Sequence, residues 1–406
     1  MNRQQEGRRL TANYALIQCI FNMAYCCIIN FAAVFLLARG FSNSAVGLTL
    51  TIANALALIT QPIIATFADQ SRRLTLRQIV AGLLLFCGLA ALLLMVTPAL
   101  LLPTAILYIL LICAFNSQGS LVVAMALDHI NAGVPINFSL ARGIGSFAFA
   151  ALALLLGNLT NRYGSEIIMP IGLVISLGGA ILVATFPKAA PSTSAESLTP
   201  AEQAIGFGEF ARRNRRFLAL LGSVTLLYFS HALINTYTIQ IVTRVGGSTA
   251  DMGMVSAIGG FLELPAMALF PLLMQRIKHA GTILKWSGVF FILKALLTLL
   301  APTVGWLYMA QCLQFFAYAL FTPASVYYVN QVIRGADKVK GQAGMTMALG
   351  VSGMIGNLLG GFMLDASGGV GFMLTVGLGV SLVGLVLVLL LTERPKPMLA
   401  ASVRYS

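Results

Sequence analysis

The sequence predicts an all-α membrane protein in which twelve transmembrane helices form two pseudo-symmetric six-helix bundles. Three observations lead to this fold class: the composition, the spacing of the apolar segments, and an internal repeat. Of the 406 residues, 58% are hydrophobic and only 9% are charged, and the mean hydropathy is +0.90. Soluble domains carry about 25% charged residues, so these charges are too few to cover a water-exposed surface. Lipid is therefore expected to be the main solvent.

The predicted helices follow one another between polar or Gly/Pro-rich breaks. A bilayer core takes about 20 apolar residues of helix, and the apolar segments of this chain are close to that length or longer. They cover approximately residues 13–38, 45–68, 77–97, 103–128, 140–158, 166–187, 215–242, 250–275, 282–300, 304–331, 342–363 and 370–392.

The first of these segments has a second interpretation. Residues 1–12 are basic and precede an apolar stretch, as in a secretory signal peptide. The stretch from Asn13 to Ala38 is longer than the apolar core of a signal peptide and has no evident cleavage site. We therefore interpret it as the first membrane helix.

Lysine and arginine predict the orientation of the helices. Twelve helices put both termini on one side, and the breaks between them then alternate between the two sides. Of the 25 Lys and Arg residues, 20 fall on the side of the termini and only three, Arg39, Arg162 and Arg244, on the other. Because cytoplasmic segments collect Lys and Arg, we expect both termini in the cytoplasm and the chain in a bacterial inner (plasma) membrane.

The longest polar break divides the chain into two halves. Residues 188–214 contain prolines, serines and threonines typical of a linker, so we predict bundles at 1–187 and 215–406. The run from Arg39 to Gly47 is echoed by the run from Arg244 to Gly253, about 205 residues later. The end of the fifth helix is echoed by the end of the eleventh at about the same offset. Two parallel six-helix repeats around a central site are an arrangement that secondary transporters use.

Composition and motifs exclude several other classes. The net charge of +13 would suit nucleic acid if the cations clustered on one face, but they fall in short groups between apolar segments. The six cysteines show no CxxC or Cys/His spacing and are interpreted as packing residues. There is no Walker-type phosphate loop and no nucleophile elbow. We therefore expect no enzyme activity, no cofactor, no metal and no nucleic-acid partner.

The junction between the fourth and fifth helices resembles a known transporter family. The run from Asp128 to Arg142 and Gly145 is similar to that of the lactose permease and phenylpropionate permease branch of the major facilitator superfamily. In that branch an acidic residue ends helix four, and Tyr/Phe-Gly-x-x-Arg-x-x-Gly opens helix five. The runs Asn214-Arg-Arg-Phe-Leu and Glu263-Leu-Pro-Ala-Met also resemble the aromatic-acid members. The resemblance implies a secondary transporter with Arg142 in its substrate cavity.

Other family positions differ in this chain. Ser139 replaces the glycine that precedes the arginine of helix five. Gln314 and Ala317 stand where the lactose permease has its proton-coupling His and Glu, and Ala124 stands where it has a sugar-binding carboxylate. Lys294 falls at the position of the permease's arginine in helix nine. The mechanism of the lactose permease therefore cannot be transferred intact.

Three charged residues fall well inside the predicted helices: Arg142, Glu263 and Lys294. An ionisable group at the bilayer centre costs about 2.5–3.5 kcal/mol and usually faces a cavity. Glu263 and Lys294 lie at comparable depth on successive helices, so we expect them to pair and to carry a coupling proton, because such a carboxylate can titrate in the physiological range. A static pair that only fixes packing is the alternative. Arg142 is predicted to contact the solute from the opposite half.

Polar side chains inside several helices predict a wet cavity. Gln18 and Asn22 lie four residues apart on one face of the first helix. With them, the candidates for hydrogen bonds to a solute are Asn116, His231 and Gln314. For each one, the alternative is a hydrogen bond that joins neighbouring helices, worth about 0.6 kcal/mol in a membrane.

A cytoplasmic gate is predicted at the ends of the second and fourth helices. Asp69, Arg72 and Arg73 occupy the superfamily's latch position, although its two glycines are absent. Asp128 is expected to pair with helix-end cations such as Arg142 and so stabilise the closed cytoplasmic side. A solvated turn that carries topology charges is the alternative for the first three residues.

Together these features predict a monomeric secondary transporter whose partners are a small solute, protons and the lipid bilayer. A sugar, a nucleoside or an aromatic or organic acid would suit the cavity, with proton-coupled symport by alternating access as the expected mechanism. A proton-driven exporter remains open, because the fold is symmetric with respect to direction. A non-transporting membrane sensor is the alternative from another class, but only about fourteen residues follow Thr392.

Overall fold

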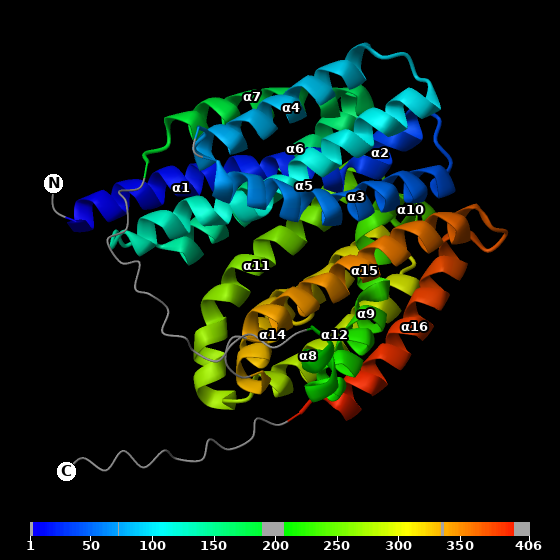
Figure 1. Ribbon diagram of the computed structural model, residues 1–406. Helices are drawn as coiled ribbons and strands as arrows, with labels where there is room; N and C mark the ends of the chain where they lie inside the picture. The colour runs from blue at the N-terminus through cyan, green and yellow to red at the C-terminus, as the bar shows by residue number, and fades with distance from the viewer. Residues whose placement is uncertain (1–2, 72, 189–206, 334–336, 394–406) are drawn as a thin grey trace, which may run out of the picture.

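Two helical bundles make up the computed structural model. It describes residues 3–71, 73–188, 207–333 and 337–393, and every regular element in these ranges is helical. Twelve helices in the described part of the chain are long and apolar enough to cross a membrane, as the sequence predicts. Figure 1 shows the first bundle in blue to green and the second in green to red, packed against each other.

The elements of the first bundle are α1 (Arg3–Tyr25), the π-helix η1 (Cys26–Asn30), α2 (Ala32–Ala38), α3 (Asn43–Gln70), α4 (Leu76–Val96), α5 (Leu101–Asn131), α6 (Phe138–Tyr163), η2 (Ser165–Ile167) and α7 (Ile168–Thr185). Those of the second are α8 (Phe207–Arg213), α9 (Arg215–Thr236), α10 (Thr238–Arg244), α11 (Thr249–Ile277), α12 (Ala280–Leu299), α13 (Val304–Cys312), η3 (Leu313–Phe315), α14 (Tyr318–Val332), α15 (Lys338–Asp365) and α16 (Gly369–Leu391). Most of the predicted linker lies outside the described residues.

The outer surface of both bundles is apolar. Large side chains such as Leu102, Val174 and Leu390 are 71%, 69% and 65% exposed. Contiguous exposed apolar surface is unusual for a soluble monomer, and lipid removes its unfavourable contact with water. With the twelve membrane-spanning helices, this surface identifies a multi-pass membrane protein.

Three of the predicted helices are interrupted where the sequence predicts continuous ones. The first contains the π-helix η1, the seventh breaks at Tyr237 between α9 and α10, and the tenth breaks at η3. Within a membrane, irregular backbone is tolerated where it is buried in protein or lines a water-filled cavity. Asn30 in η1 and Gln314 in η3 both line the cavity between the bundles. These breaks therefore belong to the candidate site.

At one end of the molecule, here called the closed end, the bundles touch through α3 with α15 and α6 with α11. A Cβ atom on Gly157 of α6 would lie 2.9 Å from the Cα atom of Gly253 of α11, so these helices approach backbone to backbone. Asp365 at the end of α15 accepts hydrogen bonds from the Ser44 backbone nitrogen at 2.7 Å and its Oγ at 2.6 Å. The bundles are therefore locked together here by both packing and polar contacts.

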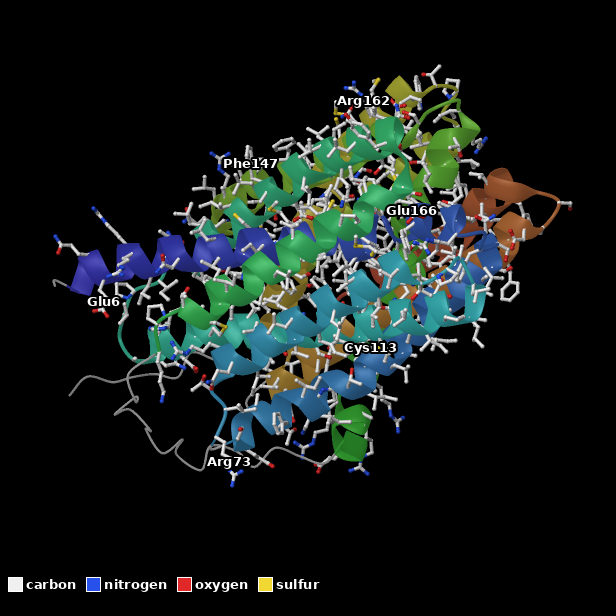
Figure 2. All side chains as sticks on the ribbon, turned by 90° about the horizontal axis from the view of Figure 1, so that it is seen from above. Glu6, Arg73, Cys113, Phe147, Arg162 and Glu166 are labelled. Carbon is white, nitrogen blue, oxygen red and sulfur yellow. The ribbon has the colours of Figure 1, made fainter. Side chains whose placement is uncertain are left out.

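The opposite end, where α1 begins, is here called the open end. In Figure 2, Glu6 and Arg73 lie towards it, and Arg162 and Glu166 lie towards the closed end. Among the described residues, the last hydrogen bond between the bundles on the way to the open end joins Ser146 to Glu263. Towards this end the helices of the two bundles diverge, as α1 and α11 show in Figure 1. The structure is therefore a conformation closed on one side only.

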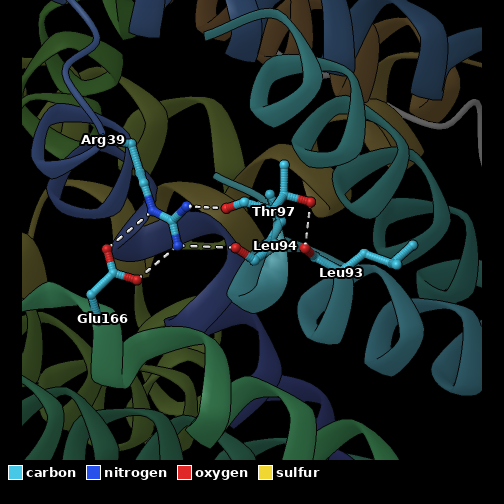
Figure 3. Close-up of polar contacts among 5 residues, drawn as sticks. All are labelled: Arg39, Leu93, Leu94, Thr97 and Glu166. Carbon is cyan, nitrogen blue, oxygen red and sulfur yellow. Dashed lines mark hydrogen bonds and ion pairs between the residues drawn. The ribbon is translucent and has the colours of Figure 1, made fainter. Parts of the chain in front are cut away.

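The internal repeat recurs in the hydrogen bonds, because equivalent residues of the two bundles make equivalent bonds. Arg39 donates from Nη2 to the Leu94 carbonyl at 3.0 Å, and Arg244 donates from Nη2 to the Leu299 carbonyl at 3.3 Å, with donor and acceptor both shifted by about 205 residues. Arg39 makes further bonds, shown in Figure 3: a bidentate pair with Glu166 and a bond to the Thr97 carbonyl. These bonds fasten α2, α4 and η2 of the first bundle together.

Candidate functional site

The candidate site is a cavity of about 350 Å³ between the two bundles. Side-chain amides make up much of its polar wall: Asn22, Asn30, Asn54, Asn235, Gln311, Gln314 and Asn357. Aromatic side chains also line the cavity: Phe21, Tyr25, Phe149, Tyr228 and Tyr318. Amides and hydroxyls can donate or accept hydrogen bonds, and aromatic faces stack on planar rings. The cavity is thus suited to a small polar solute with a flat ring.

Arg142 and Glu263 are the charged side chains among the described residues that line this cavity. Arg142 stands near the start of α6 in the first bundle, and Glu263 stands in the middle of α11 in the second. Ser146, one turn after Arg142, donates a hydrogen bond from Oγ to Glu263 Oε2 at 3.2 Å. The cavity wall therefore carries one cation from the first bundle and one carboxylate from the second.

The predicted pairing of Glu263 with Lys294 is wrong for this conformation. Lys294 is only 1% exposed, and its Nζ atom donates instead to Gln314 Oε1 at 2.6 Å. No ion pair between Lys294 and Glu263 occurs among the described residues. The break at η3 provides the physical reason, because it brings an amide oxygen to the lysine. Lys294 therefore stands behind the cavity wall, while Glu263 is part of it.

The five predicted solute contacts divide into two groups. Asn22 and Gln314 line the cavity. Gln18, Asn116 and His231 are absent from its lining, and each lies one hydrogen bond behind a residue that lines it. The Asn22 amide donates to the Gln18 backbone carbonyl at 2.8 Å, and the Gln18 side chain itself donates to the Tyr14 hydroxyl at 2.7 Å. Asn116 donates to Asn54 at 3.3 Å, and His231 Nε2 lies 2.8 Å from the Asn235 amide.

The predicted gate residues lie towards the open end and stay a prediction. Arg72 is outside the described residues, and only the backbone of Asp69, in the last turn of α3, is described. Arg73 is exposed in the turn that follows, and Asp128 is exposed near the end of α5. No ion pair between Asp128 and Arg142 occurs in the described part of the chain.

Several residues that line the cavity were not among the candidates predicted from the sequence. Tyr228 and Asn235 line the cavity on α9, and their spacing of seven residues around His231 puts them on one helical face. That spacing is a signal that could have identified them. Asn357 and Tyr25 have no comparable pattern, since a buried amide or aromatic residue in a membrane helix is also a common packing residue.

Comparisons with known proteins agree with this architecture. The model of the "MFS_1 like family" matches residues 13–374. An "Uncharacterized transporter YwbF" of Bacillus subtilis (strain 168) is 24% identical over 233 residues, which are 56% of this chain and 56% of the relative. The match thus covers little more than half the length of this curated relative.

Solved structures show the same fold at low sequence identity. A point mutant of the nucleoside transporter NupG superimposes with a TM-score of 0.75 at 15% identity, covering 95% of this chain and 100% of that one. A bacterial homologue of the iron transporter ferroportin, in an inward-facing state, gives 0.71 at 14% identity, with 95% and 99% covered. The POT family transporter PepTSo gives 0.70 at 12% identity, with 94% and 97% covered.

Proposed function

Because the chain belongs to the MFS_1 like family, we propose that it is a secondary transporter that carries a small polar solute across a membrane by alternating access. The observation that carries this proposal is the cavity between the bundles, with Arg142 on one bundle and Glu263 on the other. A solute that contacts both bundles binds with different affinity to each conformation of the transporter. A ligand can shift a conformational equilibrium by the difference between these affinities.

The charge of the cavity wall favours a neutral solute. Arg142 and Glu263 balance each other, and Lys294 is separated from the wall by its bond to Gln314. The remaining polar groups are amides and hydroxyls, beside stacking aromatic side chains. A nucleoside, with a flat base and a hydroxylated sugar, fits these groups better than a carboxylic acid. The nucleoside transporter NupG, which has the same fold, supports this class.

We further propose that a proton drives the transport, as symport, and that Glu263 carries this proton while Lys294 stays protonated behind the cavity wall. Glu263 lies among cavity residues in the middle of a membrane helix, and Lys294 is almost fully buried in the next one. Burying such groups costs about 2.5–3.5 kcal/mol on insertion scales, which purely structural packing does not require. The distribution of lysine and arginine supports an inner-membrane location with both termini in the cytoplasm.

Uptake into proteoliposomes tests this function. The full chain is reconstituted, an inward proton gradient is imposed, and labelled uridine, lactose and phenylpropionate are offered in turn. We expect uridine to accumulate above its external concentration and a protonophore to abolish the accumulation. Uptake of all three at the rate of protein-free vesicles would refute the proposed transport activity. Uptake that a protonophore leaves unchanged would refute the proton coupling alone.

A further inference from the structure

One amide of the cavity wall has its orientation fixed from behind. Gln314 lies in the short helix η3, where the tenth membrane helix breaks, and it lines the cavity. Lys294 on α12 donates a hydrogen bond from Nζ to Gln314 Oε1 at 2.6 Å. Lys294 is 1% exposed, so water does not compete for this bond. The lysine is therefore a fixed partner of the amide oxygen.

The chemistry of the lysine decides which atom of Gln314 the solute meets. An ammonium group has three N–H donors and no acceptor, whereas an amide offers an oxygen acceptor at one corner and an NH₂ donor at the other. The oxygen must therefore face Lys294. Gln314 Nε2 has no hydrogen-bond partner among the described residues, and it is absent from their fully buried unpartnered atoms, so it is accessible from the cavity. Gln314 presents a donor to whatever binds there.

Neighbouring amides lack this constraint. Asn235 also lines the cavity and lies 2.8 Å from His231 Nε2. A neutral imidazole nitrogen can either donate or accept, so Asn235 can present its oxygen or its nitrogen. Gln311 makes no side-chain hydrogen bond among the described residues and can likewise turn either way. Gln314 thus differs from both because its partner can only donate.

We propose that Lys294 is a positioning residue that makes Gln314 a hydrogen-bond donor to the solute. The transporter then selects solutes that offer a carbonyl oxygen or another acceptor at this point over analogues that offer an amino group. This inference rests on the proposed function and adds to it a rule of selectivity. If a solute offers an amino group in place of the acceptor, its N–H faces the N–H of Gln314 and neither donor is satisfied. An unsatisfied buried polar group weakens binding about tenfold to a hundredfold.

Two pairs of nucleosides test the rule, because each pair exchanges a ring carbonyl for an amino group: uridine with cytidine, and inosine with adenosine. Equilibrium binding to the purified full chain is measured for the unaltered protein, Lys294→Met and Lys294→Arg. We expect a preference of at least about tenfold for uridine and inosine. Lys294→Met should lose this preference, and Lys294→Arg should keep it, since a guanidinium also only donates.

The matched control is Thr298→Val, one turn along α12. Thr298 Oγ1 bonds to the Lys294 backbone carbonyl at 2.8 Å, so this substitution removes a buried polar atom without changing the contact with Gln314. It should retain the preference. A Lys294→Met protein that binds these nucleosides with the preference of the unaltered chain would overturn the inference.

A measurement without solute separates this inference from the proposed function. Infrared spectra of protein labelled with ¹³C at the glutamine side-chain carbonyl contain a Gln314 band, assigned by its loss in Gln314→Leu. The bond to the lysine should lower the frequency of this band, and Lys294→Met should remove the shift. An identical band in both proteins would overturn the inference whether or not nucleosides bind. If no nucleoside binds the unaltered chain, the proposed solute class fails, and the band alone decides the role of Lys294.

Discussion

Glu263 is the residue on which the proposed coupling depends. It accepts a hydrogen bond from Ser146 of the other bundle, so a change in its charge alters a contact between the bundles. Glu263→Gln keeps the size and an acceptor oxygen but cannot exchange a proton. We expect this variant to exchange labelled for unlabelled nucleoside at close to the normal rate and to accumulate none against a gradient. Counterflow and gradient-driven uptake in the same vesicles measure the two activities.

The control for this variant is Asp251→Asn on the same helix. Asp251 accepts from the Ser248 backbone nitrogen at 2.8 Å and thus caps the first turn of its own helix, away from the cavity. Accumulation should survive that substitution. Gradient-driven accumulation by Glu263→Gln at the level of the unaltered protein would contradict the coupling role.

At the residue scale, the sequence identified the cavity charges but not their partners. Arg142, Glu263 and Lys294 are conspicuous because a charge inside a membrane helix is costly. Depth along a helix, however, does not determine which side chain of another helix lies nearest. The break at η3, which puts Gln314 against Lys294, leaves no mark in hydrophobicity. The partner of the lysine therefore required the structure.

At the scale of elements, the repeat provides a matched pair of arginines. Arg39 is buried and makes four hydrogen bonds, two of them to Glu166. Its counterpart Arg244 is exposed and makes one at 3.3 Å. Arg39→Ala should lower the free energy of unfolding by about 2 kcal/mol, since bonds to charged groups are the strong ones. Arg244→Ala should change it by less than about 0.5 kcal/mol. Thermal unfolding in detergent compares them, and equal losses would contradict this difference.

The contact between α3 and α15 is expected to hold the closed end shut. Asp365 accepts hydrogen bonds from the backbone and side chains of both Asn43 and Ser44. Asp365→Asn places an NH₂ donor against these donors and should increase hydrogen exchange of residues 43–50 about tenfold. Asp337→Asn, at the opposite end of α15, is the control and should leave this exchange unchanged. Unaltered exchange in Asp365→Asn would show that packing alone closes this end.

The helices themselves were predictable, and their breaks were not. Apolar runs of about 20 residues identify membrane helices whatever their packing, so all twelve are confirmed. The breaks at η1, Tyr237 and η3 depend on whether a freed backbone group meets protein or cavity water. That depends on neighbouring helices, and a single segment does not contain the information.

At the scale of the whole molecule, the predicted major facilitator fold is confirmed by the twelve helices and by structures such as NupG. The repeat was predictable because donor and acceptor recur together, as Arg39 with Leu94 and Arg244 with Leu299 show. The branch within the superfamily, the solute and the direction stay predictions. They depend on a few cavity side chains rather than on the pattern that builds the bundles.

Distances between the two bundles test alternating access most directly. Spin labels at positions 73 and 276 report on the open end, and labels at positions 162 and 367 report on the closed end, with all four sites exposed. When nucleoside is added at acidic pH, we expect the first distance to shorten and the second to lengthen in the same fraction of molecules. If both distances stay constant in vesicles that transport the nucleoside, the proposed mechanism is contradicted.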